Sequence, residues 1–228
     1  MKKIIFICLF VVLYGFVKSQ NDSLVILNLQ DYDKISRLHI GLFIGTNYSD
    51  YIVKTNEAAS NSLVINSTAR SGFGFGIVAN VRINNFTDIR FVPSINFVEN
   101  MLSFYTPENN LITKTTIDYK STYLDFPLLF KLKPKRQGNH RPYLIIGGNF
   151  MYNLKKNNNS TQGIGISKTD YCIDFGIGLD NYRRYFKFSP ELSFSLGLSN
   201  LKANNYSVFY HDVDKISSKV ITLKLFFE

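Results

Sequence analysis

The chain has 228 residues, a formal net charge of +9, 15% aromatic residues and no tryptophan. The basic excess is not accompanied by a basic helix or a zinc-ligand spacing, so it excludes no class of fold and does not indicate nucleic-acid binding. The two cysteines are Cys8, near the N-terminus, and Cys172, so a secreted form that loses the first would have no internal disulfide.

The N-terminus has the pattern of a secretory signal peptide. Lys2 and Lys3 precede a charge-free apolar run over 4–17, and Ser19 supplies a small residue where a signal peptidase cleaves. A membrane anchor is the alternative, but this run is shorter than the ~20 residues that a spanning helix needs. We expect a signal peptide at 1–19, a periplasmic lead segment at 20–37 and a barrel domain at 38–228.

The remainder of the chain contains stretches in which apolar and polar residues alternate with period two, as in half-buried strands. The predicted strands are 38–47, 73–83, 89–97, 124–133, 143–152, 171–180, 186–198 and 219–228. Pro93 lies inside the third of them, where its missing N–H group predicts an edge or a bulge.

The connections between these strands alternate in length. Long polar stretches cover 48–71, 100–120, 155–169 and 200–218, and short turns cover 84–86, 134–140 and 181–184. Outer-membrane barrels have this order, with short periplasmic turns and longer external loops. The sequence therefore predicts an all-β fold, an eight-stranded antiparallel up-and-down transmembrane β-barrel, in the cell outer membrane and with both termini on the periplasmic side.

The two faces of the strands predict which side chains meet lipid. On the last strand, Ile221, Leu223, Leu225 and Phe227 share one face and are predicted to be lipid-facing. Charged residues on the opposite faces are predicted to fill the barrel interior as a salt-bridged plug; they are Arg82, Arg90, Asp125, Lys131, Asp174, Asp180, Lys187, Glu191 and Lys224. A soluble lipocalin-type barrel is the alternative, but its core would have to bury these charges.

No catalytic centre, cofactor site or metal site is predicted, and no small-molecule substrate is evident. His39, His140 and His211 have no metal-ligand spacing. Ser207, His211 and Asp212 are close in sequence, and a lipid or peptide hydrolase would use such a set, but polar residues of a solvated loop give this proximity by coincidence.

Several segments together resemble one family of outer-membrane proteins. Residues 121–131 (STYLDFPLLFK), the Arg-Pro-Tyr of 141–143 and the glycine pair at 147–148 are similar to the central strand pair of the PorT family. Residues 174–180 (DFGIGLD) and 185–201 are similar to its sixth and seventh strands. The likeness spans most of the expected mature chain and includes Pro93, Pro127 and Pro190.

This resemblance implies a role in the type IX protein secretion system, which exports cargo across the outer membrane and in some bacteria supports gliding. It brings no enzymatic residues, so the implied protein is not an enzyme and acts through other type IX secretion proteins. Phe226 and Phe227 also resemble the terminal signal by which barrel-assembly machinery recognises its clients. The alternative is a small outer-membrane barrel with another role, such as adhesion or lipid or peptide hydrolysis. In either case, we expect the barrel to contact outer-membrane lipid.

Overall fold

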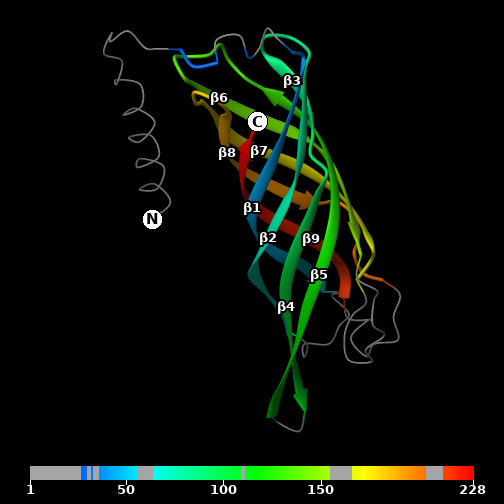
Figure 1. Ribbon diagram of the computed structural model, residues 1–228. Coiled ribbons are helices and arrows are strands. Elements are labelled where there is room, and N and C mark those ends of the chain that lie inside the picture. Colours follow the sequence, from blue (N-terminus) through cyan, green and yellow to red (C-terminus); the bar gives the residue numbers. More distant parts are fainter. Residues whose placement is uncertain are drawn as a thin grey trace, which may run out of the picture.

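The computed structural model describes residues 27–29, 32, 36–55, 64–108, 111–154, 166–203 and 213–228. Within these residues, nine strands form one antiparallel sheet that curves round on itself (Figure 1). The strands are β1 (Leu38–Thr55), β2 (Val64–Arg82), β3 (Thr87–Phe91), β4 (Ser94–Glu108), β5 (Leu111–Leu132), β6 (His140–Asn153), β7 (Thr169–Tyr182), β8 (Lys187–Gly197) and β9 (Val213–Phe227).

The sheet is closed because β9 pairs with β1 as well as with β8. Leu42 of β1 lies opposite Phe227, and the antiparallel register continues as far as Lys54 opposite Lys215. β3 and β4 lie end to end, since both pair with β2 on one side and with β5 on the other. The described wall is therefore eight strands round, and the predicted up-and-down barrel is confirmed.

Pro93 separates β3 from β4. Its carbonyl still accepts a hydrogen bond from the amide of Ile77 in β2, at 3.1 Å. On the other side, the amide of Val92 donates to the carbonyl of Pro127 in β5, at 3.2 Å. The interruption at Pro93 thus lies beside Pro127 of the continuous strand β5, and it agrees with the predicted effect of a missing N–H group in the third predicted strand.

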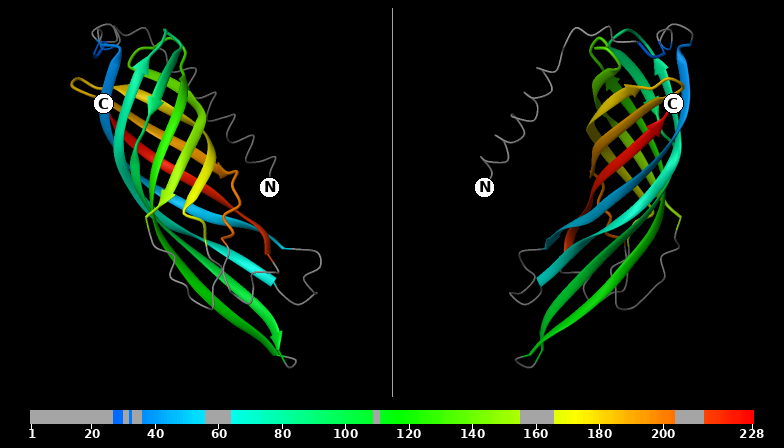
Figure 2. Two further views of the ribbon diagram at one scale, coloured as in Figure 1. Left: turned by 90° about the vertical axis from the view of Figure 1, so that its right-hand side faces the viewer. Right: turned by 60° about the vertical axis from the view of Figure 1, so that its left-hand side comes forward.

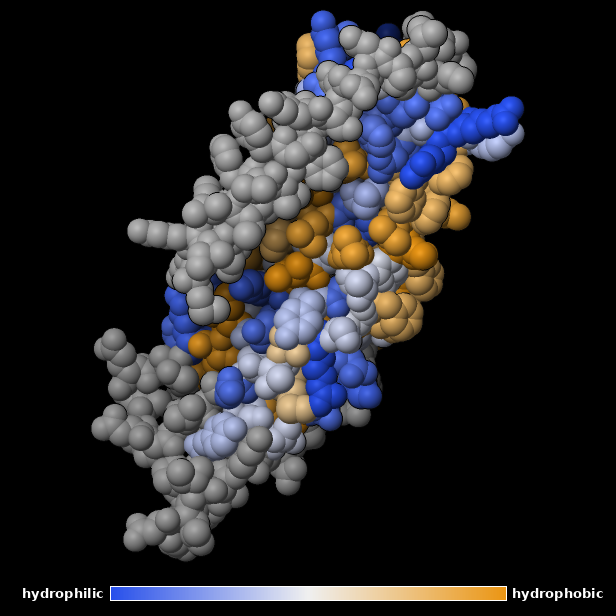
Figure 3. Space-filling view, turned by 90° about the vertical axis from the view of Figure 1, so that its left-hand side faces the viewer, coloured by the Kyte–Doolittle hydropathy of each residue, from blue (hydrophilic) through white to orange (hydrophobic). Residues whose placement is uncertain are grey.

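Side chains alternate between the outside of the wall and the lumen. In β7, for example, Tyr171, Ile173 and Phe175 are exposed, whereas Cys172 and Asp174 are buried. Figure 3 shows apolar side chains gathered over the middle of the visible wall and hydrophilic ones toward its ends. An apolar exterior around a charged lumen is the inverse of a lipocalin-type barrel, so the soluble alternative is wrong.

The two ends of the barrel differ. The turn end carries the short connections that follow β2, β5 and β7, and the hairpin end carries the long β1–β2 and β4–β5 hairpins (Figure 2). The β4–β5 hairpin projects well beyond the rest of the barrel wall (Figure 2).

Two of the predicted long loops are largely strand, which corrects the sequence-based expectation. β1 continues to Thr55 and β2 begins at Val64, so most of 48–71 is hairpin, and only 109–110 separate β4 from β5 within the predicted loop 100–120. Threonine and tyrosine in these stretches favour strands even where neither face is apolar. The predicted signal peptide and much of the loops 155–169 and 200–218 lie outside the described residues.

Candidate functional site

Arg90 of β3 is the centre of the lumen at the turn end. Its side chain is fully buried, and Nη1 lies 2.8 Å from Oε2 of Glu191 in β8. Nη2 lies 3.3 Å from Oε1 of Glu228, which follows β9. The hydroxyl of Tyr143 donates to the same oxygen of Glu191 at 3.0 Å, and the Phe226 ring lies 4.8 Å from the guanidinium carbon. One arginine therefore links three strands across the lumen.

Two lysines extend this network around the wall. Nζ of Lys131 in β5 lies 2.7 Å from both carboxylate oxygens of Asp180 in β7, and the hydroxyl of Ser189 donates to the same carboxylate at 2.7 Å. Nζ of Lys187 lies 2.7 Å from Oε2 of Glu228. Each of these charges is buried, and each has an oppositely charged partner, as buried charges require.

A third lysine completes the network near the β2–β3 turn. Nζ of Lys133 lies 2.6 Å from Oδ2 of Asp88, which also accepts a hydrogen bond from Asn80 at 2.9 Å. The network at the turn end thus joins four cationic and four acidic side chains, which are Arg90, Lys131, Lys133, Lys187, Asp88, Asp180, Glu191 and Glu228.

The lumen toward the hairpin end is also polar. Asp125, Asp174 and Lys224 are buried there, and Asn96 donates to Oδ2 of Asp125 at 2.6 Å. Asp170 accepts a hydrogen bond from the hydroxyl of Ser218 at 2.5 Å. This half of the lumen is held mainly by hydrogen bonds to amide and hydroxyl groups.

Both ends of the lumen are covered. At the hairpin end, a buried apolar cluster lies across the barrel; it consists of Tyr51, Leu102, Ile166, Leu201, Val213 and Ile216. At the turn end, the backbone N–H of Asn28 in the lead segment donates to Oδ1 of Asn139, at 2.9 Å, and Arg136 donates to the carbonyl of Leu29. Tyr32 stacks on His39, with ring centroids 4.0 Å apart, and burial raises the pKa of its hydroxyl above the ordinary value.

This arrangement fills the lumen with side chains, held by ion pairs at the turn end and mainly by hydrogen bonds toward the hairpin end, as expected for a barrel of eight strands. Within the described residues, such an interior acts as a plug and leaves no wide aqueous path. Among the described residues, no group of three histidine, cysteine or acidic side chains could hold a metal ion.

Comparison with known protein families agrees with this architecture. The model of the family described as "outer membrane protein beta-barrel domain" matches residues 18–203. The chain belongs to this family. It is an outer-membrane protein, and in such barrels the short turns face the periplasm and the longer connections face the exterior. We therefore call the turn end periplasmic and the hairpin end external.

Solved structures similar to this family member are also small outer-membrane barrels. OprG from Pseudomonas aeruginosa is 13% identical, with a TM-score of 0.47 and coverage of 82% of this chain and 93% of that one. Neisserial surface protein A is 12% identical, with a TM-score of 0.42 and coverage of 84% and 98%. Ail of Yersinia pestis, in complex with the heparin analogue sucrose octasulfate, is 12% identical, with a TM-score of 0.39 and coverage of 84% and 99%.

No curated protein sequence matches the chain. Within the described residues, no helix is long and apolar enough to span a membrane.

The sequence-predicted lumen residues lie mostly in the plug. Eight of them are buried inside the barrel; they are Arg90, Asp125, Lys131, Asp174, Asp180, Lys187, Glu191 and Lys224. Asp125, Asp174 and Lys224 form no ion pair with the described residues, so the salt-bridged part of the predicted plug is confined to the other five. Arg82 departs from the prediction, because it lies half-exposed at the periplasmic end of β2 and donates to the carbonyl of Asn84 and to Oδ1 of Asn85. The β2–β3 turn holds this guanidinium at the rim.

The closing strand has the predicted orientation of side chains, with Leu223 and Phe227 exposed on the outer wall and Ile221 and Leu225 half-buried on the same face.

Sequence reasoning missed three members of the plug. Asp88, Lys133 and Glu228 each continue the inward alternation of a residue that was identified, two or four positions away in the same strand or just beyond it. The signal was therefore present as period two. Lys133 and Glu228 are the last residues of predicted strands, and Asp88 lies between a predicted turn and the predicted strand that begins at residue 89. The polar set Ser207, His211 and Asp212 lies outside the described residues.

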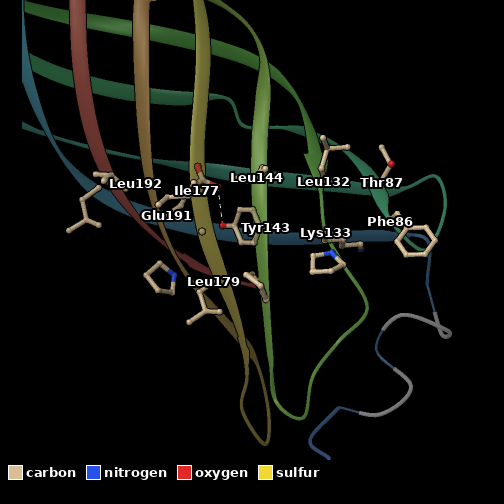
Figure 4. Close-up of a pocket in the computed structure, with 15 residues that line it drawn as sticks. Phe86, Thr87, Leu132, Lys133, Tyr143, Leu144, Ile177, Leu179, Glu191 and Leu192 are labelled. Atoms are coloured by element: carbon tan, nitrogen blue, oxygen red, sulfur yellow. Dashed lines mark hydrogen bonds between the residues drawn. The ribbon is translucent and has the colours of Figure 1, made fainter. Parts of the chain in front are cut away.

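An apolar hollow of about 760 Å³ lies at the periplasmic end of the wall. Figure 4 shows Leu144, Ile177, Leu179 and Leu192 around it, with the Tyr143–Glu191 hydrogen bond at its inner side. An apolar lining of this kind suits a hydrocarbon chain better than a polar substrate.

Gly178 of β7 permits the position of Tyr143. A Cβ atom at residue 178 would lie 2.2 Å from Cζ of Tyr143, whose hydroxyl is held by Glu191. We expect Gly178→Val to lower the free energy of unfolding by about 1–3 kcal/mol, the usual cost of overpacking. Urea unfolding of the barrel in lipid vesicles measures it. Gly148→Val is the matched control, because nothing lies within 4 Å of a Cβ there, and equal losses in the two variants would contradict the assignment.

Proposed function

We propose that this outer-membrane barrel is a non-enzymatic component of the type IX protein secretion system, needed for the export of cargo proteins, and that it acts through protein–protein contacts. The observation that carries the proposal is the filled lumen. A barrel whose interior is a network of paired side chains has its external hairpins and periplasmic turns left for function.

The resemblance to the PorT family supports this particular system. The similar segments fall on β5, β6, β7 and β8, which supply Lys131, Tyr143, Asp180 and Glu191 to the plug. These segments therefore carry both the resemblance and the residues that close the lumen.

The periplasmic rim offers a second contact surface. Lys135 is exposed in the β5–β6 turn, and Arg183 and Arg184 are exposed in the β7–β8 turn, beside Tyr185, which is 80% exposed. Exposed cations next to an aromatic residue suit contact with periplasmic secretion proteins or with the headgroups of outer-membrane lipid. During its insertion into the outer membrane, the barrel would be recognised by the barrel-assembly machinery through Phe226 and Phe227.

Deletion of the gene is expected to abolish cargo export, because the proposed component is needed for it. Cargo in the culture medium and in the periplasm measures it, with re-expression of the full chain as the control. Unchanged export in the deletion strain would contradict the proposal.

A further inference from the structure

β5 is longer than its neighbour on one side. Its pairing with β6 runs only from Leu132 opposite Leu144 to Tyr123 opposite Asn153. Its pairing with β4 continues to Leu111 opposite Glu108. Among the described residues, no strand pairs with the β6-facing edge of 111–122, and this edge lies on the projecting hairpin (Figure 2). We call this stretch the free edge.

The direction of the backbone groups along the free edge follows from two hydrogen bonds. The carbonyl of Thr122 accepts from the amide of Leu154 at 2.8 Å, so Thr122 points its N–H and C=O groups toward β6. The carbonyl of Pro127 accepts from Val92, on the opposite side of the strand. Because these groups alternate in an antiparallel strand, residues 112, 114, 116, 118 and 120 present theirs to the free edge.

The hairpin holds this edge in place. Ile117 and Tyr119 pack against the apolar cluster that covers the lumen, which fixes one face of β5. On the other face, Nη2 of Arg70 lies 3.6 Å from Oδ1 of Asp118, and Nζ of Lys120 lies 3.2 Å from Oε1 of Glu99. Asp118 and Lys120, the charged residues of the edge whose side chains the structure describes, are therefore paired within the hairpin.

A strand edge whose backbone groups pair with no other described strand is a template for an added strand. Since Asp118 and Lys120 are compensated within the hairpin, this part of the edge favours a neutral, extended segment and recognises it through its main chain. We propose that the free edge of β5 binds an extended segment of a partner protein as an added β-strand. This proposal deepens the proposed function and rests on it for the identity of the partner as a secretion protein or its cargo.

The binding mode can be tested with the full-length barrel in detergent micelles. The probe is a labelled peptide that copies residues 99–106, all of which pair with the other edge of β5. The peptide is N-methylated at alternate positions, so that only one of its own edges can pair. We expect saturable binding by fluorescence anisotropy. A peptide N-methylated at every residue is expected to bind at least tenfold more weakly, and equal binding of the two peptides would overturn the proposal.

Two variants of the barrel test the location. Thr116→Pro with Asp118→Pro removes two free-edge donors, and proline is tolerated at strand edges. Thr116→Ala with Asp118→Ala is the matched control, because it makes the same side-chain losses and keeps both donors. We expect the proline variant to bind the peptide at least tenfold more weakly and the alanine variant to bind within about twofold of the native chain. Heat-modifiability of both variants verifies folding, and equal peptide affinities would overturn the proposal.

Cargo export separates this proposal from the proposed function. If deletion of the gene abolishes export and the proline variant exports normally, the free-edge proposal fails and the function stands. If deletion leaves export unchanged while the peptide binds as described, the function fails and the edge remains a strand-binding site. Light scattering that shows a dimer of the native chain, lost in the proline variant, would assign the edge to a second copy and overturn the partner proposal.

Discussion

Truncation after Leu223 is expected to abolish barrel assembly. Residues 224–227 pair with β1 on one side and with β8 on the other, and Glu228 makes two of the ion pairs in the plug. Without these residues, the barrel cannot close at its periplasmic end. The facing edges of β1 and β8 are then unpaired in lipid, where each unsatisfied backbone group costs several kcal/mol.

The measurement is the fraction of the chain in the outer membrane together with the heat-dependent shift of the folded form on a gel. Leu225→Ala is the control, because it removes a half-buried side chain on the outer wall and keeps the backbone pairing of the strand. We expect this variant to assemble. A truncated chain that reached the membrane and still shifted on heating would refute the role of the last residues in closure.

Substitution of Arg90 by methionine is expected to be the most destabilising single change in the lumen. The arginine is fully buried and contacts the carboxylates of Glu191 and Glu228. Removing one partner of a buried ion pair leaves an uncompensated charge, which costs about 3–5 kcal/mol. Glu228 keeps Lys187 as a partner, so most of the loss arises at Glu191.

Urea unfolding in lipid vesicles measures this loss. The double variant Arg90→Met with Glu191→Gln is expected to recover part of it, because the unpaired carboxylate is then neutral. Arg183→Met is the matched control in the exposed β7–β8 turn, where a change within about 0.5 kcal/mol is expected. A double variant that is less stable than Arg90→Met alone would contradict the ion-pair explanation.

The membrane-spanning part of the fold could be predicted because lipid outside and charge inside impose period two on the sequence. Residues 171–180 show this, since their alternating pattern gives both the strand and the faces of Asp174 and Asp180. In the projecting hairpin this constraint is absent, because both faces of a strand can be polar there. Ser103, Thr116 and Asp118 therefore belong to stretches without apolar–polar alternation, although they lie in strands of the β4–β5 hairpin. Period two is thus a property of the environment as much as of the strand.

The partners in the lumen could not be predicted from periodicity. Arg90 and Glu191 are 101 positions apart, and Lys131 and Asp180 are 49 apart. Which inward side chains meet depends on the stagger of the strands around the closed barrel, which the sequence pattern does not determine. Arg82 shows the same limit, because its inward register at the end of β2 does not place it in the plug.

β5 joins the external hairpin to the centre of the plug in one piece. It runs without interruption from Leu111, at the projecting tip, to Leu132, next to the β5–β6 turn. Lys131, near the periplasmic end of the strand, is the partner of Asp180. At about 3.3 Å per residue, this single strand extends for roughly 70 Å. One covalent backbone therefore connects the tip of the external hairpin, across the whole membrane, to the Lys131–Asp180 salt bridge on the periplasmic side.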